Sequence, residues 1–587
     1  MNHFYPATTL ALALSQAGTA LAENPYLEEV IVTSSRIEMP LRQVGTSVSV
    51  VTREKIQQRG FNSLHDILRS QPSIGVTNAG GAGKATSLRI RGEESYRTLV
   101  LLDDIDISDT STPQVTPRME HLLSSGIQRV EILRGPQGLM YGADAGGVVN
   151  ITTVRQTDGL AGQVSAEGGR YGSQQFAGNL GWGNETIDVN VSAADFQTDG
   201  FNARTTDQDL RDDDGYDNTT LHGRFGWNVS EDLRLSLVAR NVDGDTDYDG
   251  CFNPDTFASS NRCKDEFEQD IWRVAGDYQW GRFSHQGFYS NSETNRDSYS
   301  DGQFSGRFDG EIERYGYQGS FQGSDALRLV YGVDLETESA DGTFLTGDRD
   351  QDGYYLEYQG GFKDRIFLTA GARYDDNDDF GTHTSYRTSG AYLVPLPGGE
   401  LKLKAAYGTG FRAPSLSEIA TNLSPFTLPP TAGLELSEEE SDGYDLGLSW
   451  LGDNGLYLEA VYFDQTISDE IVYDPLSFGY FQANGDTEST GVELITEWLL
   501  SDSLTLTGNY TYNDTETFEG NSRPFRPEHL GNLGVEWRPV ADRLTLGLNV
   551  RLSHDAQDVD GTELDDYELV DINASYIVGR GLEVYGR

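Results

Sequence analysis

The stretch Leu233-Arg-Leu-Ser-Leu-Val-Ala239 places apolar and polar side chains in alternation. The same pattern returns in Leu401-Lys-Leu-Lys-Ala-Ala-Tyr407 and in Leu504-Thr-Leu-Thr-Gly-Asn-Tyr510. Because successive side chains of a β-strand point to opposite faces, each stretch predicts a strand with one apolar and one polar face. Segments of this kind, roughly ten residues long, follow one another from residue 156 to the end of the chain. The pattern predicts an all-β structure for most of the protein.

The ends of these segments distinguish a membrane barrel from a soluble sandwich, in which the apolar faces would form a core. Short connections such as 451–454 alternate with long ones such as 243–266 and 414–438, the asymmetry of periplasmic turns and extracellular loops. Many segment ends carry aromatic residues, as the interfacial girdles of membrane barrels do. They are Trp227, Trp280, Tyr354, Trp450, Tyr457, Trp498, Tyr512 and Trp537. We therefore expect the apolar faces to contact lipid and the polar faces to line a lumen.

The strand count sets the size of the barrel. About 21 segments lie between Gly162 and the end of the chain, whereas a barrel of this class closes with about 22. We expect an all-β transmembrane barrel over residues 156–587, of about 22 antiparallel strands in full, with its C-terminal strand missing after Arg587. The expected structure has an open seam between its first and last strands; a complete native end would instead pair them without a gap.

Residues 37–155 differ from the rest, since short β runs are mixed with helix-like segments such as 63–68. A barrel of about 22 strands has a lumen too wide for its own side chains to fill. We therefore expect these residues to form an N-terminal α+β plug domain in the lumen.

The first residues resemble an export signal. An apolar stretch, Thr8 to Leu14, precedes Ala20-Leu-Ala22, the small-residue pattern of a cleavage site. The only basic side chain before it is His3, so a frayed cytosolic N-terminus is the alternative. The prediction is a signal peptide over residues 1–22, followed by an N-terminal segment over residues 23–36.

The two cysteines, Cys251 and Cys263, enclose a short polar segment. In an exported protein such a pair predicts a loop disulfide, and two unrelated thiols are the alternative.

Composition excludes several classes of protein. With 43 basic and 93 acidic residues the net charge is −50, which disfavours nucleic acid as a partner. No apolar stretch approaches the ~18 residues of a spanning helix. The eight histidines form no H-E-x-x-H motif and no G-x-S-x-G motif is present, so we expect no enzyme. A surface barrel that binds or adheres without transport is a further alternative.

Motifs along residues 28–587 resemble those of TonB-dependent outer-membrane receptors. They are Glu28-Glu-Val-Ile-Val-Thr33 with Ser34-Ser-Arg36, Leu88-Arg-Ile-Arg-Gly92, Leu101-Leu-Asp-Asp104, Arg129 to Pro136, Met140-Tyr-Gly142, Gly146 to Ile151, Gly408 to Glu418, Glu440 to Leu446, Gly491-Val-Glu493 and Arg523 to Pro527. In one departure, Tyr141 to Gly147 is one residue shorter than the usual spacing. The resemblance implies a Gram-negative outer membrane, with its lipid around the barrel, and active import without covalent chemistry or a required cofactor. It also implies TonB, of the TonB-ExbB-ExbD complex, as the partner that pulls on the chain.

The first of these motifs resembles the TonB box. Its residues are Glu28, Glu29, Val30, Ile31, Val32 and Thr33. An extended, β-branched run of this kind is suited to add a strand to a partner's sheet edge, through which a pulling force is carried. The alternative is an ordinary first strand of the plug.

Within the family, the chain is most similar to vitamin B12 (cobalamin) receptors. Residues 76–84 align without gaps to the glycine-rich apical plug loop of that group, and residues 372–383 resemble one of its barrel stretches. The resemblance implies ligand contacts from the loop, namely Asn78, Ala79, Gly80, Gly81, Ala82, Gly83 and Lys84. Ala79, Ala82 and Lys84 replace polar, uncharged residues of the pattern. Ferric siderophore or haem import is the alternative.

The resemblance also implies calcium ligands in the extracellular loops. The matching positions are Asp212, Asp214, Tyr248, Asp249 and Asp265. Calcium prefers six to eight oxygen ligands, and clustered carboxylates repel one another until a cation arrives. One departure is Asn202, a neutral amide in place of an anionic ligand. A second pattern, Asp348-x-Asp350-x-Asp352, copies half of an EF-hand loop but lacks its final glutamate. The alternative without a metal site is a solvated acidic surface suited to a saline medium.

Overall fold

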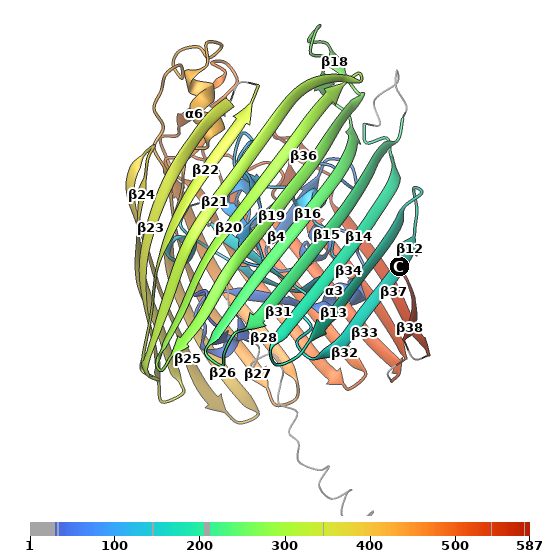
Figure 1. The fold of residues 1–587 in the computed structure, drawn as a ribbon, viewed down its shortest axis with the longest axis vertical. Coiled ribbons are helices and arrows are strands. Elements are labelled where there is room, and N and C mark those ends of the chain that lie inside the picture. Colours follow the sequence, from blue (N-terminus) through green and yellow to red (C-terminus); the bar gives the residue numbers. More distant parts are fainter. Residues whose placement is uncertain are drawn as a thin grey trace, which may run out of the picture.

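The computed structural model describes residues 30–31, 34–143, 146–204, 212–343, 345–541, 543–579 and 581–587. A 21-stranded antiparallel sheet curls around the N-terminal part of the chain, drawn in blue inside it (Figure 1). Neighbouring strands of the sheet are consecutive along the chain. In order they are β12 (Gly159–Gly168), β13 (Gln174–Gly183), β14 (Ile187–Phe201), β15 (Asp214–Asn228), β16 (Leu233–Tyr248), β19 (Cys263–Trp280), β20 (Phe283–Ser300), β21 (Gln303–Ser324), β22 (Leu327–Gly342), β23 (Leu345–Phe362), β24 (Ile366–Asn377), β25 (Gly381–Leu396), β26 (Gly399–Arg412), β27 (Glu439–Gly452), β28 (Leu456–Ser468), β31 (Thr487–Ser501), β32 (Leu504–Glu516), β33 (His529–Val540), β34 (Leu544–His554), β37 (Tyr567–Gly579) and β38 (Leu582–Gly586).

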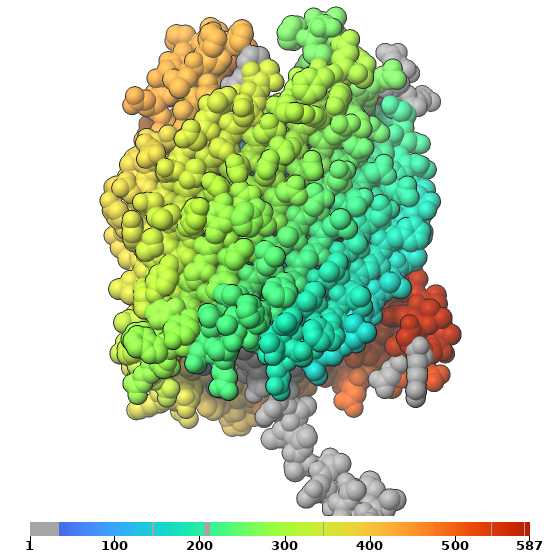
Figure 2. Space-filling view, viewed as in Figure 1, coloured from blue at the N-terminus to red at the C-terminus, as the bar shows by residue number. Residues whose placement is uncertain are grey.

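The alternation of apolar and polar residues in the sequence corresponds to side chains that point alternately to the outer face and to the lumen. In β16, Leu235 and Leu237 are exposed on the outer face, whereas Val238 and Arg240 are buried on the lumen side. The outer surface is continuous over these strands, and the β26–β27 connection rises above it at one end (Figure 2). The predicted apolar outer face is therefore confirmed, and the polar face contacts the domain in the lumen.

The sheet has two edges, β12 and β38. In the described part of the chain no backbone ladder joins these two strands, as expected for an open seam. The Tyr585 side chain of β38 lies close to Glu167 and Ser165 of β12 across the seam.

The domain in the lumen is built on a mixed five-stranded sheet in the order β3-β10-β11-β6-β7. The strands are β3 (Val48–Thr52), β10 (Ile127–Leu133), β11 (Gly147–Thr153), β6 (Thr98–Leu102) and β7 (Ile105–Asp106). Helix α3 (Arg53–Arg59) begins at the capping side chain of Thr52 and ends at Gly60, whose φ of 66° suits glycine. Helix α4 (Leu64–Leu68) confirms the helix expected at 63–68, and its Leu64 and Ile67 are completely buried in the domain's core.

Shorter elements complete the fold. They are β1 (Val30–Ile31), β2 (Met39–Pro40), β4 (Ile74–Asn78), β5 (Thr86–Ile90), β8 (Ser108–Asp109), β9 (Thr116–Pro117), β17 (Cys251–Phe252), β18 (Ser259–Ser260), β29 (Ile471–Asp474), β30 (Gly479–Gln482), β35 (Ala556–Gln557), β36 (Glu563–Leu564), α5 (Gly138–Tyr141), α6 (Leu416–Leu423) and the 3₁₀ turns η1 (Leu41–Gln43), η2 (Ser95–Arg97) and η3 (Met119–His121).

The long connections lie at one end of the wall, where α6 and the β17–β18 hairpin stand above the strands (Figure 1). We call this end the outer mouth. The expected disulfide is confirmed at the base of the hairpin, where Cys251 and Cys263 are bonded with their Cα atoms 5.9 Å apart. Among the described helices, none has the length and apolar character needed to cross a membrane.

Candidate functional site

Buried ion pairs fasten the domain in the lumen to the wall. Arg91 of the domain donates from Nε to Glu493 of β31 at 2.9 Å and from Nη1 to Asp445 of β27 at 2.7 Å. Arg134 approaches the second oxygen of Glu493 to 3.2 Å. Such charges are costly to leave without a partner in a dry interior. The domain can therefore leave the wall only if water or new partners replace these contacts.

A second network reaches the outer mouth. Arg97 of the domain contacts Glu439 at 2.8 Å and Glu470 at 2.9 Å. Arg412 contacts the same Glu439 at 2.9 Å and Glu418 of α6 at 3.0 Å. The carboxylate of Glu418 also closes the capping box of α6. A movement of the domain at Arg97 is thus coupled by direct contacts to the long β26–β27 connection.

A third network lies next to the expected TonB box. Asp334 of β22 forms ion pairs with three guanidinium groups: those of Arg36 at 3.1 Å, Arg314 at 2.9 Å and Arg373 at 2.7 Å. Arg36 lies three residues after the expected box, and Ser35 just before it accepts a hydrogen bond from Arg387 of β25 at 3.1 Å, so the chain meets the wall directly after the box. The motifs quoted from the sequence contain several of these arginines, but nothing local in the sequence identifies their partners.

Of the expected box itself, Val30 and Ile31 pair in β1 with β2, antiparallel. The other four residues, Glu28, Glu29, Val32 and Thr33, lie outside the described residues.

The expected ligand loop is the turn between β4 and β5, and Asn78 organises it. Its Oδ1 accepts from the backbone N–H groups of Gly80 and Gly81 at 3.0 and 2.5 Å, and its Nδ2 donates to Thr86 Oγ1 at 2.8 Å. Gly80, Gly81 and Gly83 all have positive φ, a conformation that other residues rarely adopt. Only Asn78 and Ala79 of the seven predicted contacts are exposed; Gly80, Gly81 and Ala82 are half-buried, and the remaining two are buried.

Lys84, one of those two, is buried against the wall. Its Nζ donates to the backbone carbonyl oxygens of Ala82 at 3.1 Å, Asp214 at 3.1 Å and Gly215 at 3.2 Å. The residue is 2% exposed. Burial lowers the pKa of this ammonium to about 8, while neighbouring carboxylates act in the opposite direction.

The five expected calcium ligands separate into two groups. Asp214 and Asp249 accept from the backbone N–H groups of Ala203 and Arg204, at 2.7 and 3.1 Å. Both lie beside Lys84, and Asp212 lies beside Asp214. The Tyr248 hydroxyl instead donates to Asp265 at 3.2 Å, and Arg296 lies 3.8 Å from the same carboxylate. Within the described residues, these five do not bring three ligand atoms within 4.8 Å of one another.

The EF-hand-like pattern takes a different form in the structure. Asp348, Asp350 and Asp352 lie in the extended strand β23. Alternate residues of a strand are about 6.6 Å apart along it, so these carboxylates do not wrap around one ion.

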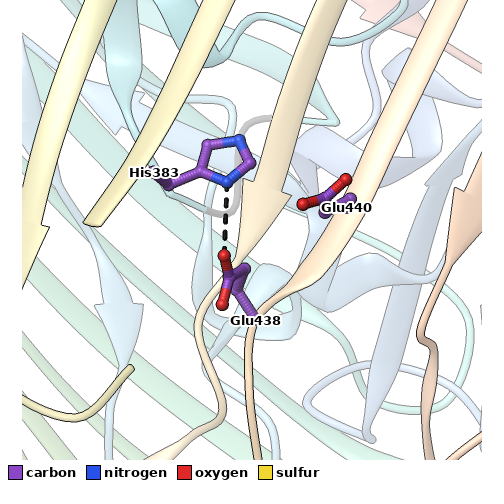
Figure 3. Close-up of side chains that lie close together, drawn as sticks. All are labelled: His383, Glu438 and Glu440. Carbon is purple, nitrogen blue, oxygen red and sulfur yellow. Dashed lines mark hydrogen bonds and ion pairs between the residues drawn. The ribbon is translucent and has the colours of Figure 1, made fainter. Parts of the chain in front are cut away.

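Another group of side chains has metal-ligand geometry. His383 at the outer end of β25 lies with Nδ1 3.4 Å from Glu438 Oε1, and the Glu440 carboxylate points toward both (Figure 3). One ligand atom from each lies within 4.8 Å of the others, and the His383 ring packs on Phe411 with centroids 4.6 Å apart. An imidazole with two carboxylates suits Zn²⁺ better than calcium. The sequence carries no signal for this group, because His383 and Glu438 are 55 positions apart.

Comparison with known families decides the class of protein. The family model for the TonB-dependent receptor-like β-barrel matches residues 153–587, and that for the TonB-dependent receptor plug domain matches residues 40–149. The chain belongs to the TonB-dependent receptor family. This receptor is 28% identical over 608 aligned residues to the vitamin B12 transporter BtuB of Photobacterium profundum, with 99% of this chain and 95% of the relative covered.

Solved structures share the receptor's fold. A variant of the ferric enterobactin receptor PfeA from Pseudomonas aeruginosa superposes with a TM-score of 0.77 at 17% identity, covering 94% of this chain and 93% of that one. The siderophore receptor PirA from Pseudomonas aeruginosa gives a TM-score of 0.70 at 19% identity, covering 92% and 94%. At this identity the solved structures share the fold alone. Membership of the TonB-dependent receptor family makes the chain a transport receptor and not an enzyme, as the sequence predicts.

Proposed function

We propose that this receptor imports cobalamin or a related corrinoid across the outer membrane of a Gram-negative bacterium, driven by TonB. The observation that supports the ligand is the similarity to a vitamin B12 transporter over essentially the whole of both chains. The apolar outer face of the strands, with Leu235 and Leu237 exposed, suits a wall in contact with lipid.

In the proposed cycle the ligand contacts Asn78 and Ala79, the exposed residues of the apical loop. TonB then pairs with the box at residues 28–33 and pulls, so the force reaches Arg36 and its partner Asp334. Loosening of the ion pairs at Arg91 and Arg134 lets the plug rearrange, because water can solvate the charges as they separate.

The alternative ligand is a ferric siderophore or haem. The solved relatives named above are siderophore receptors, but at 17% to 19% identity they share only the fold. The two ligands are therefore compared directly in the test.

The test is titration calorimetry of the full-length receptor in detergent with cyanocobalamin, with and without Ca²⁺, and in parallel with a ferric catecholate siderophore. We expect saturable binding heat with cyanocobalamin and no binding heat with the siderophore. Heat with the siderophore and none with cyanocobalamin would replace the proposed ligand with the alternative.

Uptake by cells tests the role of TonB. Deletion of residues 28–33 is expected to abolish uptake of labelled cobalamin while leaving binding unchanged. Full uptake by the deletion variant would contradict TonB-driven transport and would favour a binding barrel.

A further inference from the structure

The Lys84 ammonium lies in an acidic surrounding. The carboxylates of Asp214, Asp247 and Asp249 act on its charge, and Asp212 acts on Asp214 and Asp247 in turn. These residues lie at the outer ends of β15 and β16, two neighbouring strands. Three acidic groups thus act on one cation that belongs to the plug, and a fourth, Asp212, lies beside two of them.

The apical loop is fitted closely to the same place. A Cβ atom on Gly83 would lie 2.1 Å from the Tyr216 ring, and one on Gly80 would lie 2.4 Å from Ala203. The Thr246 hydroxyl donates to the Gly83 carbonyl at 3.2 Å. The loop therefore rests on the wall. Lys84 lies between a carbonyl group of the loop, at Ala82, and two carbonyl groups of the wall, at Asp214 and Gly215.

The donor set fits an ammonium group. Lysine has three N–H donors and no acceptor, and each donor of Lys84 has one carbonyl oxygen at 3.1 to 3.2 Å. Calcium requires six to eight oxygens at 2.3 to 2.6 Å. Here two of the carboxylates accept from backbone N–H groups, of Ala203 and Arg204. The ammonium thus supplies in this place the positive charge that a metal ion would bring.

We propose that the Lys84 ammonium is a built-in cation that positions the apical loop on the acidic ends of β15 and β16, in place of a bound calcium ion. The wall then presents Asn78 and Ala79 to the mouth without depending on calcium in the medium. The inference holds whichever ligand the receptor carries, because every contact in it is between residues of this chain.

The test replaces Lys84 with methionine in the full-length receptor, without ligand. Hydrogen exchange of residues 79–85 is measured with and without millimolar Ca²⁺, and Ca²⁺ binding is measured by calorimetry. In the wild type we expect protection that calcium does not change. In Lys84→Met we expect exchange about ten-fold faster without calcium, protection restored by calcium, and newly measurable Ca²⁺ binding, since the carboxylates at the ends of β15 and β16 have lost their cation.

Lys264→Met is the matched control. Lys264 lies on the neighbouring strand β19 and pairs with Asp245 and Glu266. It is half-buried and acts on Asp247 as well, but among the described residues it forms no hydrogen bond with the plug loop. This variant is expected to behave as the wild type. Lys84→Gln, which keeps a polar side chain, replaces Lys84→Met if circular dichroism shows that the methionine variant does not fold.

Three results would overturn the proposal. Stoichiometric Ca²⁺ binding by the wild type that Lys84→Met leaves unchanged would place the metal elsewhere. Unchanged exchange in the folded Lys84 variant would remove the positioning role. A loss of protection that calcium does not restore would show that the cluster is not a cation site.

Discussion

The carboxylate of Asp334 stabilises the contact between the N-terminal segment and the wall. Asp334 is 2% exposed and compensates the buried Arg314 and Arg373 together with Arg36, which is half-buried beside the expected box. Asp334→Asn removes the charge but keeps the shape. Among the described residues, Arg314 and Arg373 would keep only Glu336 and Asp375 as carboxylate partners, and Arg36 would lose its ion pair. We therefore expect destabilisation of about 3–5 kcal/mol, measured by urea unfolding.

An exposed pair provides the control for this substitution. Arg307 and Asp297 form an ion pair in which the arginine side chain is 61% exposed. Asp297→Asn is expected to cost less than about 1 kcal/mol, because solvent screens such pairs. Equal losses in the two variants would contradict the account of Asp334.

Glu94 of the plug gives the receptor an acid-sensitive contact. Burial raises its pKa, but Arg526, Arg523, Arg89 and Arg97 outweigh burial and hold it at about 2. A carboxyl with a lowered pKa stabilises the folded state above its unfolded value, and this contribution is lost as the pH falls toward 2. The wild type should therefore lose stability between about pH 4.5 and 2 more steeply than Glu94→Gln. If thermal unfolding showed the same pH dependence of stability in the wild type and in Glu94→Gln, the lowered pKa of Glu94 would be contradicted.

At the scale of elements, the connection between β26 and β27 is held at both of its ends. The capping box at Ser415 starts α6, and the contact of Glu438 with His383 joins the end of the connection to β25. Both anchors depend on carboxylates near the outer mouth. Sequence signals reveal the first, since Ser415 and Glu418 are three positions apart, and cannot reveal the second.

The contact between His383 and Glu438 is also a candidate metal site. We expect the receptor to bind one Zn²⁺ ion at His383, Glu438 and Glu440, because an imidazole and two carboxylates are ligands that zinc accepts. Calorimetry with Zn²⁺ should show binding in the wild type and its loss in His383→Ala and in Glu440→Gln. Glu435→Gln, an exposed position on the same connection, should retain it. Equal binding by His383→Ala would exclude this site.

At the scale of the whole molecule, transport requires the plug to move against the wall. Ser73 of the plug and Thr511 of β32 face each other, with their hydroxyl oxygens 3.3 Å apart. Ser73→Cys with Thr511→Cys can therefore join the two by a disulfide. In the oxidised form we expect unchanged ligand binding and uptake reduced at least about ten-fold, with recovery on reduction, because the plug cannot leave the wall.

Each single-cysteine variant serves as the control for this cross-link and should import normally. Full uptake by the oxidised double variant would show that the plug does not separate from β32 during transport.

The sequence determined the wall of this receptor, because the alternation around Leu235 and Leu237 is a local property that every strand carries within itself. It also predicted the disulfide between Cys251 and Cys263, while the structure decided against two separate thiols. Local patterns likewise predicted the helix at 63–68.

Only the tertiary structure decided what the charged residues do. Lys84 aligns with ligand-contacting positions in the sequence, yet it binds carbonyls of the wall 130 positions away. Arg91 and Glu493 are 402 positions apart and meet because the sheet curls around the plug. Charge partners are chosen by the folding of distant segments into one buried interface, where an unpaired charge is costly, and no local pattern records that choice.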